Sequence, residues 1–156
     1  MRQQLAVLHK MLLDTVRDPV CRRLMTAPGV GAVVALTHRA TVDQPQRFVH
    51  SRAVGAHVGL TPKRYQSGEI DYDGGVSKCG DALLRTMLYE AAHSLLIQSR
   101  KWSWLKAWGI RVAQRRGIRR AIVAVARRLA VVLHRMWVDG SEFHWKKDSA
   151  AVPVGA

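Results

Sequence analysis

The chain has 156 residues, a length that suits a single domain with one hydrophobic core. Lys and Arg total 25 against 11 Asp and Glu, so the formal net charge is +14. A protein this basic usually binds a polyanion, either nucleic acid or an anionic membrane surface; a basic surface that meets only solvent is the alternative.

The two cysteines, Cys21 and Cys79, stand alone, without the paired spacing of a zinc site or a disulfide framework. We therefore expect no metal ligands in this chain and a reducing, cytoplasmic setting. No apolar run follows the basic start, which argues against a signal peptide. The most apolar stretch, residues 121–133, is interrupted by Arg127 and Arg128, so we expect no membrane span.

Taken in chain order, the sequence predicts a mainly α-helical, compact multi-helix domain. Residues 3–17 place Leu5, Leu8, Leu12 and Val16 at spacings of three and four, which is typical of an amphipathic helix. Pro19 should end or kink it. This helix is either the start of the domain or the end of a longer helical linker, and its apolar stripe could pack against another subunit.

Residues 24–40 contain a Pro-Gly-Val-Gly turn ahead of a helix predicted from Val30 to about Arg39. A helix-hairpin-helix-like turn of this kind exposes N–H groups at a helix N-terminus, which suits a DNA phosphate, so Gly29 and Gly31 are candidate contacts. The alternative is a tight turn that needs glycine dihedral angles.

Residues 47–59 are expected to form another short helix, closed by Gly59 at the position after its C-cap. Residues 63–81 are polar and rich in glycine, which predicts an irregular central loop. Asp81 should cap a helix over residues 82–98. Further helices are predicted over 102–114 and 118–138.

The last of these helices places six apolar residues on one side: Ile118, Ile122, Val125, Leu129, Val132 and Met136. Arginines gather on the other side: Arg116, Arg120, Arg127, Arg128 and Arg135. Between residues 82 and 138 a single acid, Glu90, accompanies twelve Lys and Arg. Because exposed helices normally intersperse both signs, we expect the arginines to contact DNA phosphates, with plain solvation as the alternative.

The central stretch holds the candidates for chemistry. Ser67 follows the basic pair Lys63 and Arg64, and Ser77 precedes Lys78. A serine beside glycine is ordinarily a turn residue. The acids that follow Gly68 imitate the start of a calcium loop, but glycine stands where that loop needs its final glutamate, so an EF-hand is excluded.

Four motifs in order give a family resemblance: LMTAPGVGAVVALTHRA, RFVHSRAVGAHVGLTPKRYQSGEID, GGVSKCGDALLRTMLYEAAHSLL and RRLAVVLHRMWVDGSEF. The chain resembles, over residues 24–143, the C-terminal domain of the IS110/IS116 insertion-sequence transposases, which include the pilin-gene invertases and the bridge-RNA-guided recombinases. The resemblance implies a helical domain whose serine attacks DNA.

The family's serine falls on Ser67, with Ser77 as the second choice. Lys63, Arg64 and Lys78 would then neutralise the attacked phosphate. Glu69 stands where many members have a second glycine, a departure from the family pattern.

The resemblance also implies an N-terminal RuvC-like domain, whose four acids hold Mg²⁺. Residues 1–23 are too short for that domain, so we expect the metal from another chain or segment and no cofactor in this one. The expected partners are DNA, a guide RNA, and either copies of this chain or a RuvC-like half, in the bacterial cytoplasm at the nucleoid.

The expected division is an N-terminal helix at 1–23, the serine domain at 24–145 and a disordered tail at 146–156. The chain alone is expected not to cut DNA. The alternatives are a non-catalytic nucleic-acid-binding module, including a truncated transposon remnant, and a membrane-surface protein that uses its basic helix.

Overall fold

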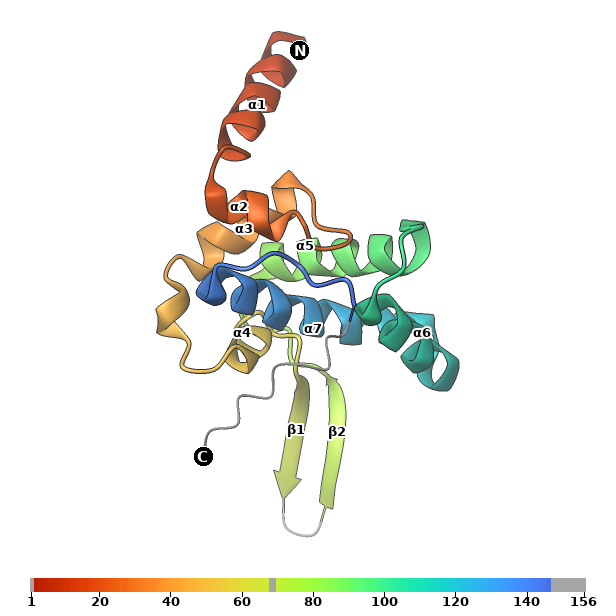
Figure 1. Cartoon of the computed structure of the whole chain (residues 1–156). Helices are drawn as coiled ribbons and strands as arrows, with labels where there is room; N and C mark the ends of the chain where they lie inside the picture. Colours follow the sequence, from red (N-terminus) through yellow and green to blue (C-terminus); the bar gives the residue numbers. More distant parts are fainter. Residues whose placement is uncertain (1, 68–69, 147–156) are drawn as a thin grey trace.

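A computed structural model describes residues 2–67 and 70–146 (Figure 1). In chain order the elements are α1 (Arg2–Thr15), α2 (Pro19–Leu24), α3 (Ala32–Val42), the 3₁₀ turn η1 (Pro45–Arg47), α4 (Arg52–His57), β1 (Pro62–Ser67), β2 (Ile70–Val76), α5 (Ala82–His93), the π-helical turn η2 (Ser94–Gln98), α6 (Trp104–Arg116) and α7 (Ile118–Asp139). The prediction of a mainly α-helical, compact domain is confirmed. No helix within the described ranges is long and apolar enough to cross a bilayer.

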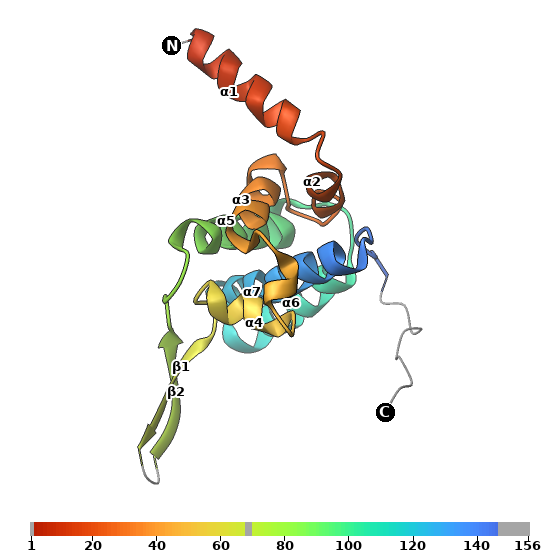
Figure 2. The same cartoon turned by 90° about the vertical axis from the view of Figure 1, so that its left-hand side faces the viewer.

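Helix α7 lies at the centre of the molecule, with α4, α5 and α6 packed around it (Figures 1 and 2). Its buried residues cover more than the predicted face: Ala121, Ile122, Val125, Ala126, Leu129, Ala130, Leu133, His134 and Met136. The apolar-stripe prediction is wrong for Ile118, which is 46% exposed. Ile118 begins the helix directly after Gly117, while several helices cover the middle of α7, and the small alanines there allow close packing.

The segment after α7 folds back on the domain. Gly140 takes a left-handed conformation and ends the helix. Phe143 is buried, and its N–H donates to the hydroxyl of Thr26 (2.9 Å). The indole N–H of Trp104 donates to the carbonyl of His144 (2.9 Å), and Trp104 stacks on Phe143 at an interplanar angle of 15°. The contact between Phe143 and Thr26 joins the two ends of the domain. The predicted disordered tail at 146–156, apart from Lys146, lies outside the described residues.

Helix α1 projects from the body of the molecule (Figures 1 and 2). Its predicted stripe is uncovered at the outer end, where Leu5 and Leu8 are 63% and 58% exposed. Pro19, which was expected to end or kink the first helix, lies in the first turn of the next helix, α2. Asp18 caps α2, because its side chain accepts a hydrogen bond from the N–H of Val20 (2.9 Å).

The expectation of an irregular central loop is wrong. Strands β1 and β2 pair as an antiparallel hairpin that projects from the helices (Figures 1 and 2). The strand sequences KRYQS and IDYDG contain few apolar residues. They therefore lack the regular apolar–polar alternation by which a half-buried strand is predicted. A hairpin that stands clear of the core pairs backbone groups and needs no apolar face.

Two histidines are buried, His38 on α3 and His134 on α7. Both ring nitrogens of His134 have partners, the hydroxyl of Ser51 (2.9 Å) and the carbonyl of Pro45 (2.8 Å). His38 is fully buried, and neither of its ring nitrogens has a hydrogen-bond partner within the described structure. Burial, reinforced by nearby His134, lowers the pKa of His38 to about 4, while the backbone of Ala130 acts in the opposite direction.

The depressed pKa of His38 predicts loss of stability in mild acid. In the unfolded chain this imidazole takes up a proton near pH 6.5, whereas the folded state resists it until about pH 4. Stability from this group is thus present above pH 6.5 and is lost as the pH falls toward 4. One pKa unit corresponds to about 1.36 kcal/mol, so lowering the pH from neutral to 5 should reduce the free energy of unfolding by about 2 kcal/mol.

Urea unfolding of the wild type, His38→Leu and His50→Leu at both pH values measures this effect. His38→Leu should remove about 2 kcal/mol of the pH difference. His50→Leu, at an exposed position, controls for the loss of one histidine. An unchanged pH difference in His38→Leu would contradict the assignment.

Candidate nucleic-acid interface

The hairpin carries the predicted nucleophile at its outer end. Ser67 is the last residue of β1 and pairs with Ile70, the first residue of β2. The residues between them, Gly68 and Glu69, lie outside the described part of the chain. For Lys63, Arg64 and Ser67 the structure describes the backbone in β1, while their side chains lie outside what it describes.

Ser77, the second-choice nucleophile, lies at the opposite end of the hairpin. Its N–H donates to the carbonyl of Thr61 (2.9 Å), just outside the paired strands, and its side chain is half-buried. Lys78 follows, exposed, with an N–H that donates to the carbonyl of Gly59 (3.2 Å). The structure therefore separates Ser67 from the pair formed by Ser77 and Lys78.

Two glycines hold the base of the hairpin against α4. Gly59 (φ +69°) lies against the backbone of Cys79, and Gly80 (φ +110°) lies against the carbonyl oxygen of His57. A Cβ atom at either glycine would collide with those backbone atoms. Gly59 follows the C-cap of α4, as predicted. These backbone contacts bring the segments that flank β1 and β2 together beside the end of α4.

The Pro-Gly-Val-Gly turn connects α2 to α3. Gly29 has φ +78°, and its α-carbon lies so close to the carbonyl oxygen of Ala91 on α5 that a Cβ would collide with it. Gly31 is exposed with open space around it, at the N-cap of α3. Close packing on α5 thus accounts for Gly29, while Gly31 alone leaves helix N–H groups facing solvent.

The five predicted arginines are all exposed, and they lie beside different elements. Arg116 ends α6 and Arg120 lies in the first turn of α7. The stem of Arg127 packs beside Gly55 on α4, where an added Cβ would lie 3.2 Å from its Cγ. Arg135 lies 4.0 Å from Asp139 in an exposed ion pair.

Arg128 has a structural role that the angular pattern did not indicate. Its guanidinium lies 4.4 Å from the ring centre of Trp108 and 5.3 Å from that of Trp104. Partial burial lowers the pKa of Arg128, the direction expected when a cation loses water. A cation stacked on two indoles fastens α7 to α6.

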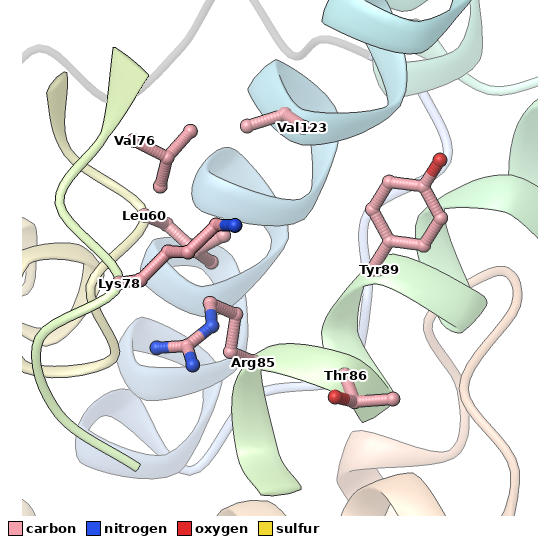
Figure 3. A pocket seen from close by; sticks show the side chains of 7 residues that line it. All are labelled: Leu60, Val76, Lys78, Arg85, Thr86, Tyr89 and Val123. Atoms are coloured by element: carbon pink, nitrogen blue, oxygen red, sulfur yellow. The ribbon is translucent and has the colours of Figure 1, made fainter. Parts of the chain in front are cut away.

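A pocket of about 280 Å³ opens between the hairpin and the helices, and we call it the hairpin-base pocket (Figure 3). Its walls come from the hairpin and the segment before it, from α5 and from α7. The lining residues are Leu60, Val76, Lys78, Arg85, Thr86, Tyr89 and Val123.

Of these residues, sequence reasoning singled out only Lys78. Arg85 and Tyr89 were missed because they lie on the otherwise apolar helix α5, whose pattern indicates packing. The available signal was the spacing of Arg85 and Tyr89 by one helical turn on the face next to the Asp81 cap.

Within the described ranges, no group of three or more His, Cys, Asp or Glu side chains is arranged to hold a metal ion. These residues therefore do not fit the Mg²⁺ site that the resemblance implies for a complete transposase.

Comparison with known proteins agrees with the motif resemblance. A family model described as "Transposase IS116/IS110/IS902 family" matches residues 21–109, more than half of the chain. The chain is 37% identical over 118 residues to a "Transposase for insertion sequence element IS1111A" from Coxiella burnetii, a match that covers 72% of this chain and 31% of the relative. It is 35% identical over 75 residues to the "Transposase for insertion sequence element IS1328" from Yersinia enterocolitica, covering 48% of this chain and 22% of the relative. The chain thus spans less than a third of either relative.

Proposed function

Because the chain belongs to the IS116/IS110/IS902 family of insertion-sequence transposases, we propose that it binds DNA and supplies Ser67 as the nucleophile for strand cleavage and exchange. The observation that supports this role is the backbone position of Ser67, at the outer end of strand β1 in a hairpin that projects from the helical body (Figure 1). A nucleophile on a projecting surface element can approach the scissile phosphate of a duplex, which is a wide and rigid polymer.

In the proposed reaction the Ser67 oxygen attacks the phosphorus of a phosphodiester and loses its proton to a base or water. One P–O bond forms and one breaks, so a deoxyribose hydroxyl leaves and a phosphoserine ester remains. Attack by a hydroxyl of another strand reverses the step and rejoins the DNA. The number of phosphoester bonds is unchanged, so no ATP is needed.

Lys63 and Arg64, on the same strand as Ser67, would neutralise the phosphate in this proposal. Lys78 lies beyond the opposite end of the hairpin and is too far from Ser67 for the role expected of it. The Mg²⁺ of the complete enzyme would come from a RuvC-like half on another chain or segment. The remaining expected partners are a guide RNA and further copies of the chain, at the nucleoid of a bacterial cytoplasm.

The proposal is tested by trapping the covalent intermediate. The chain is mixed with the RuvC-like half of a related transposase, Mg²⁺ and a nicked DNA end whose leaving fragment diffuses away. A covalent protein–DNA adduct is expected, and mass spectrometry should locate the phosphoserine on the peptide that contains Ser67. The chain without the RuvC-like half should give no adduct, and an adduct on another residue would contradict the proposal.

Two arginines of α7 offer a matched pair for the DNA-binding part of the proposal. Arg120→Ala should lower the slope of log K against log salt by about one, because one phosphate contact is lost, with stability within about 0.5 kcal/mol of wild type. Arg128→Ala should lower the unfolding free energy by about 1 kcal/mol through loss of its indole stack. Binding titrations at several salt concentrations and thermal unfolding measure both effects; an unchanged slope in Arg120→Ala would show that this side chain faces only water.

A further inference from the structure

The hairpin-base pocket combines two kinds of wall. Leu60 is buried at 4% exposure, and Val123 and Tyr89 are half-buried, so one part of the pocket is apolar and aromatic. Lys78 and Arg85 lie on the side opposite Tyr89 (Figure 3). A free phosphate would not need the apolar wall, and an aliphatic side chain would not need two cations. A nucleotide has both a flat base and an anionic phosphate, so it matches both walls.

Arg85 is oriented by a hydrogen bond, and Lys78 is placed at the pocket by its backbone conformation. Arg85 donates from Nη1 to the carbonyl of Val58 (3.2 Å), which orients the guanidinium while leaving other N–H groups free. Lys78 has φ +54°, a left-handed conformation uncommon for residues other than glycine, which places its side chain at the pocket. Among the side chains that the structure describes, no carboxylate lies within 4.0 Å of either cation. Strained residues of this kind cluster at functional sites.

The pocket is also small. Gly59 and Gly80 lie in close backbone contact beside its hairpin side. Its volume of about 280 Å³ lies just under the range of about 300–1,000 Å³ typical of drug-sized ligands, which leaves room for a single base. A base stacked in a duplex cannot enter such a pocket, whereas an unpaired one can.

We propose that the hairpin-base pocket holds one unpaired nucleotide of a DNA strand, with its base against Tyr89 and its phosphate against Lys78 and Arg85. The proposal rests on the DNA-binding function proposed above. It assigns the pocket a role distinct from cleavage: it anchors the strand at the base of the hairpin while Ser67 stands at the tip. A transposase that exchanges strands must hold DNA that has left the duplex, and a fixed nucleotide prevents that strand from sliding past the nucleophile.

The test compares two short DNA duplexes of equal sequence, one fully paired and one with a single bulged 2-aminopurine nucleotide. Fluorescence anisotropy should show about tenfold tighter binding of the bulged duplex, the order expected for one base–aromatic stack. The 2-aminopurine emission should fall on binding, because the base stacks on Tyr89. Equal affinity for the two duplexes would overturn the proposal that the pocket binds a nucleotide, but it would leave the proposed DNA-binding function standing. Failure to bind either duplex would overturn both proposals.

Two variants locate the effect. Val123→Trp fills the pocket and should abolish the preference for the bulge while the paired duplex binds as before. Val138→Trp, at an exposed position on the same helix, is the matched control and should keep the preference. Should Val123→Trp fail to fold, Tyr89→Leu removes the stacking ring and should reduce the preference about fivefold.

A preference that survives in a folded Val123→Trp or in Tyr89→Leu would overturn the assignment to this pocket. A bulged RNA duplex that binds more tightly than the bulged DNA would assign the pocket to RNA and overturn the choice of DNA.

Discussion

Replacing Ser67 with alanine is expected to abolish the covalent protein–DNA adduct, whereas Ser77→Ala should still form it. Loss of a nucleophile typically costs a factor on the order of 10³ or more, because no other group makes the bond. The hairpin separates the two serines: the six residues of β1, at about 3.4 Å each, put its ends on the order of 20 Å apart. One scissile phosphate cannot be attacked from both positions.

Denaturing gels of radiolabelled DNA, with the RuvC-like half and Mg²⁺ supplied, measure the adduct. Salt-dependent binding to intact DNA should be the same for Ser67→Ala and wild type, which separates loss of chemistry from loss of binding. Equal adduct from wild type and Ser67→Ala would exclude Ser67. Absence of adduct from every form, with binding retained, would favour the non-catalytic DNA-binding module.

Gly80→Ala is expected to destabilise the domain by about 2–5 kcal/mol, since it combines backbone strain with a steric collision. The φ of +110° is unfavourable for alanine, and the new methyl group would collide with the carbonyl oxygen of His57, which belongs to the backbone and cannot rotate away. Relief requires the hairpin base to move away from α4. The hairpin-base pocket should then lose its shape together with the position of Lys78.

Two other glycines serve as matched controls in the same urea unfolding series. Gly117 also has a positive φ (+84°) but open space around it, so Gly117→Ala should cost only the backbone strain, about 1–2 kcal/mol. Gly31 has neither feature, and Gly31→Ala should change stability by about 1 kcal/mol or less. If the Gly80→Ala variant were as stable as Gly117→Ala, the backbone near His57 would accommodate the added methyl group at no measurable cost, and this prediction would be contradicted.

Local chemistry made most of the helices predictable, although α2 was not predicted and α4 is shorter than the helix expected over residues 47–59. Asp81 accepts from the N–H of Leu84 (2.6 Å), as expected for an N-cap, because that interaction spans only three residues. Gly59 follows the C-cap of α4 for the same local reason. The spacing of apolar residues correctly indicated the long helix α7, since burial of one helical face imposes that period. The order of four motifs was specific enough to indicate the transposase family.

Three features depend on contacts between distant segments, which no local pattern contains. The strands pair through backbone groups, so their side chains carried no signal for the hairpin that separates Ser67 from Ser77. The angular pattern of α7 grouped arginines that its neighbours treat differently, since Arg128 meets the indoles of α6 while Arg127 lies beside α4. The hairpin-base pocket exists only where the hairpin, α5 and α7 meet.

The sequence by itself determined the helices, their caps, the excess of positive charge and the family, because each follows from residue type and near neighbours. The tertiary structure alone decided which serine lies at the outer end of the hairpin, which arginine packs on the indoles, and that Lys78 and Arg85 line one pocket. Those outcomes depend on how backbones approach one another, and close approach is set by glycines and small residues whose partners lie far away in the chain.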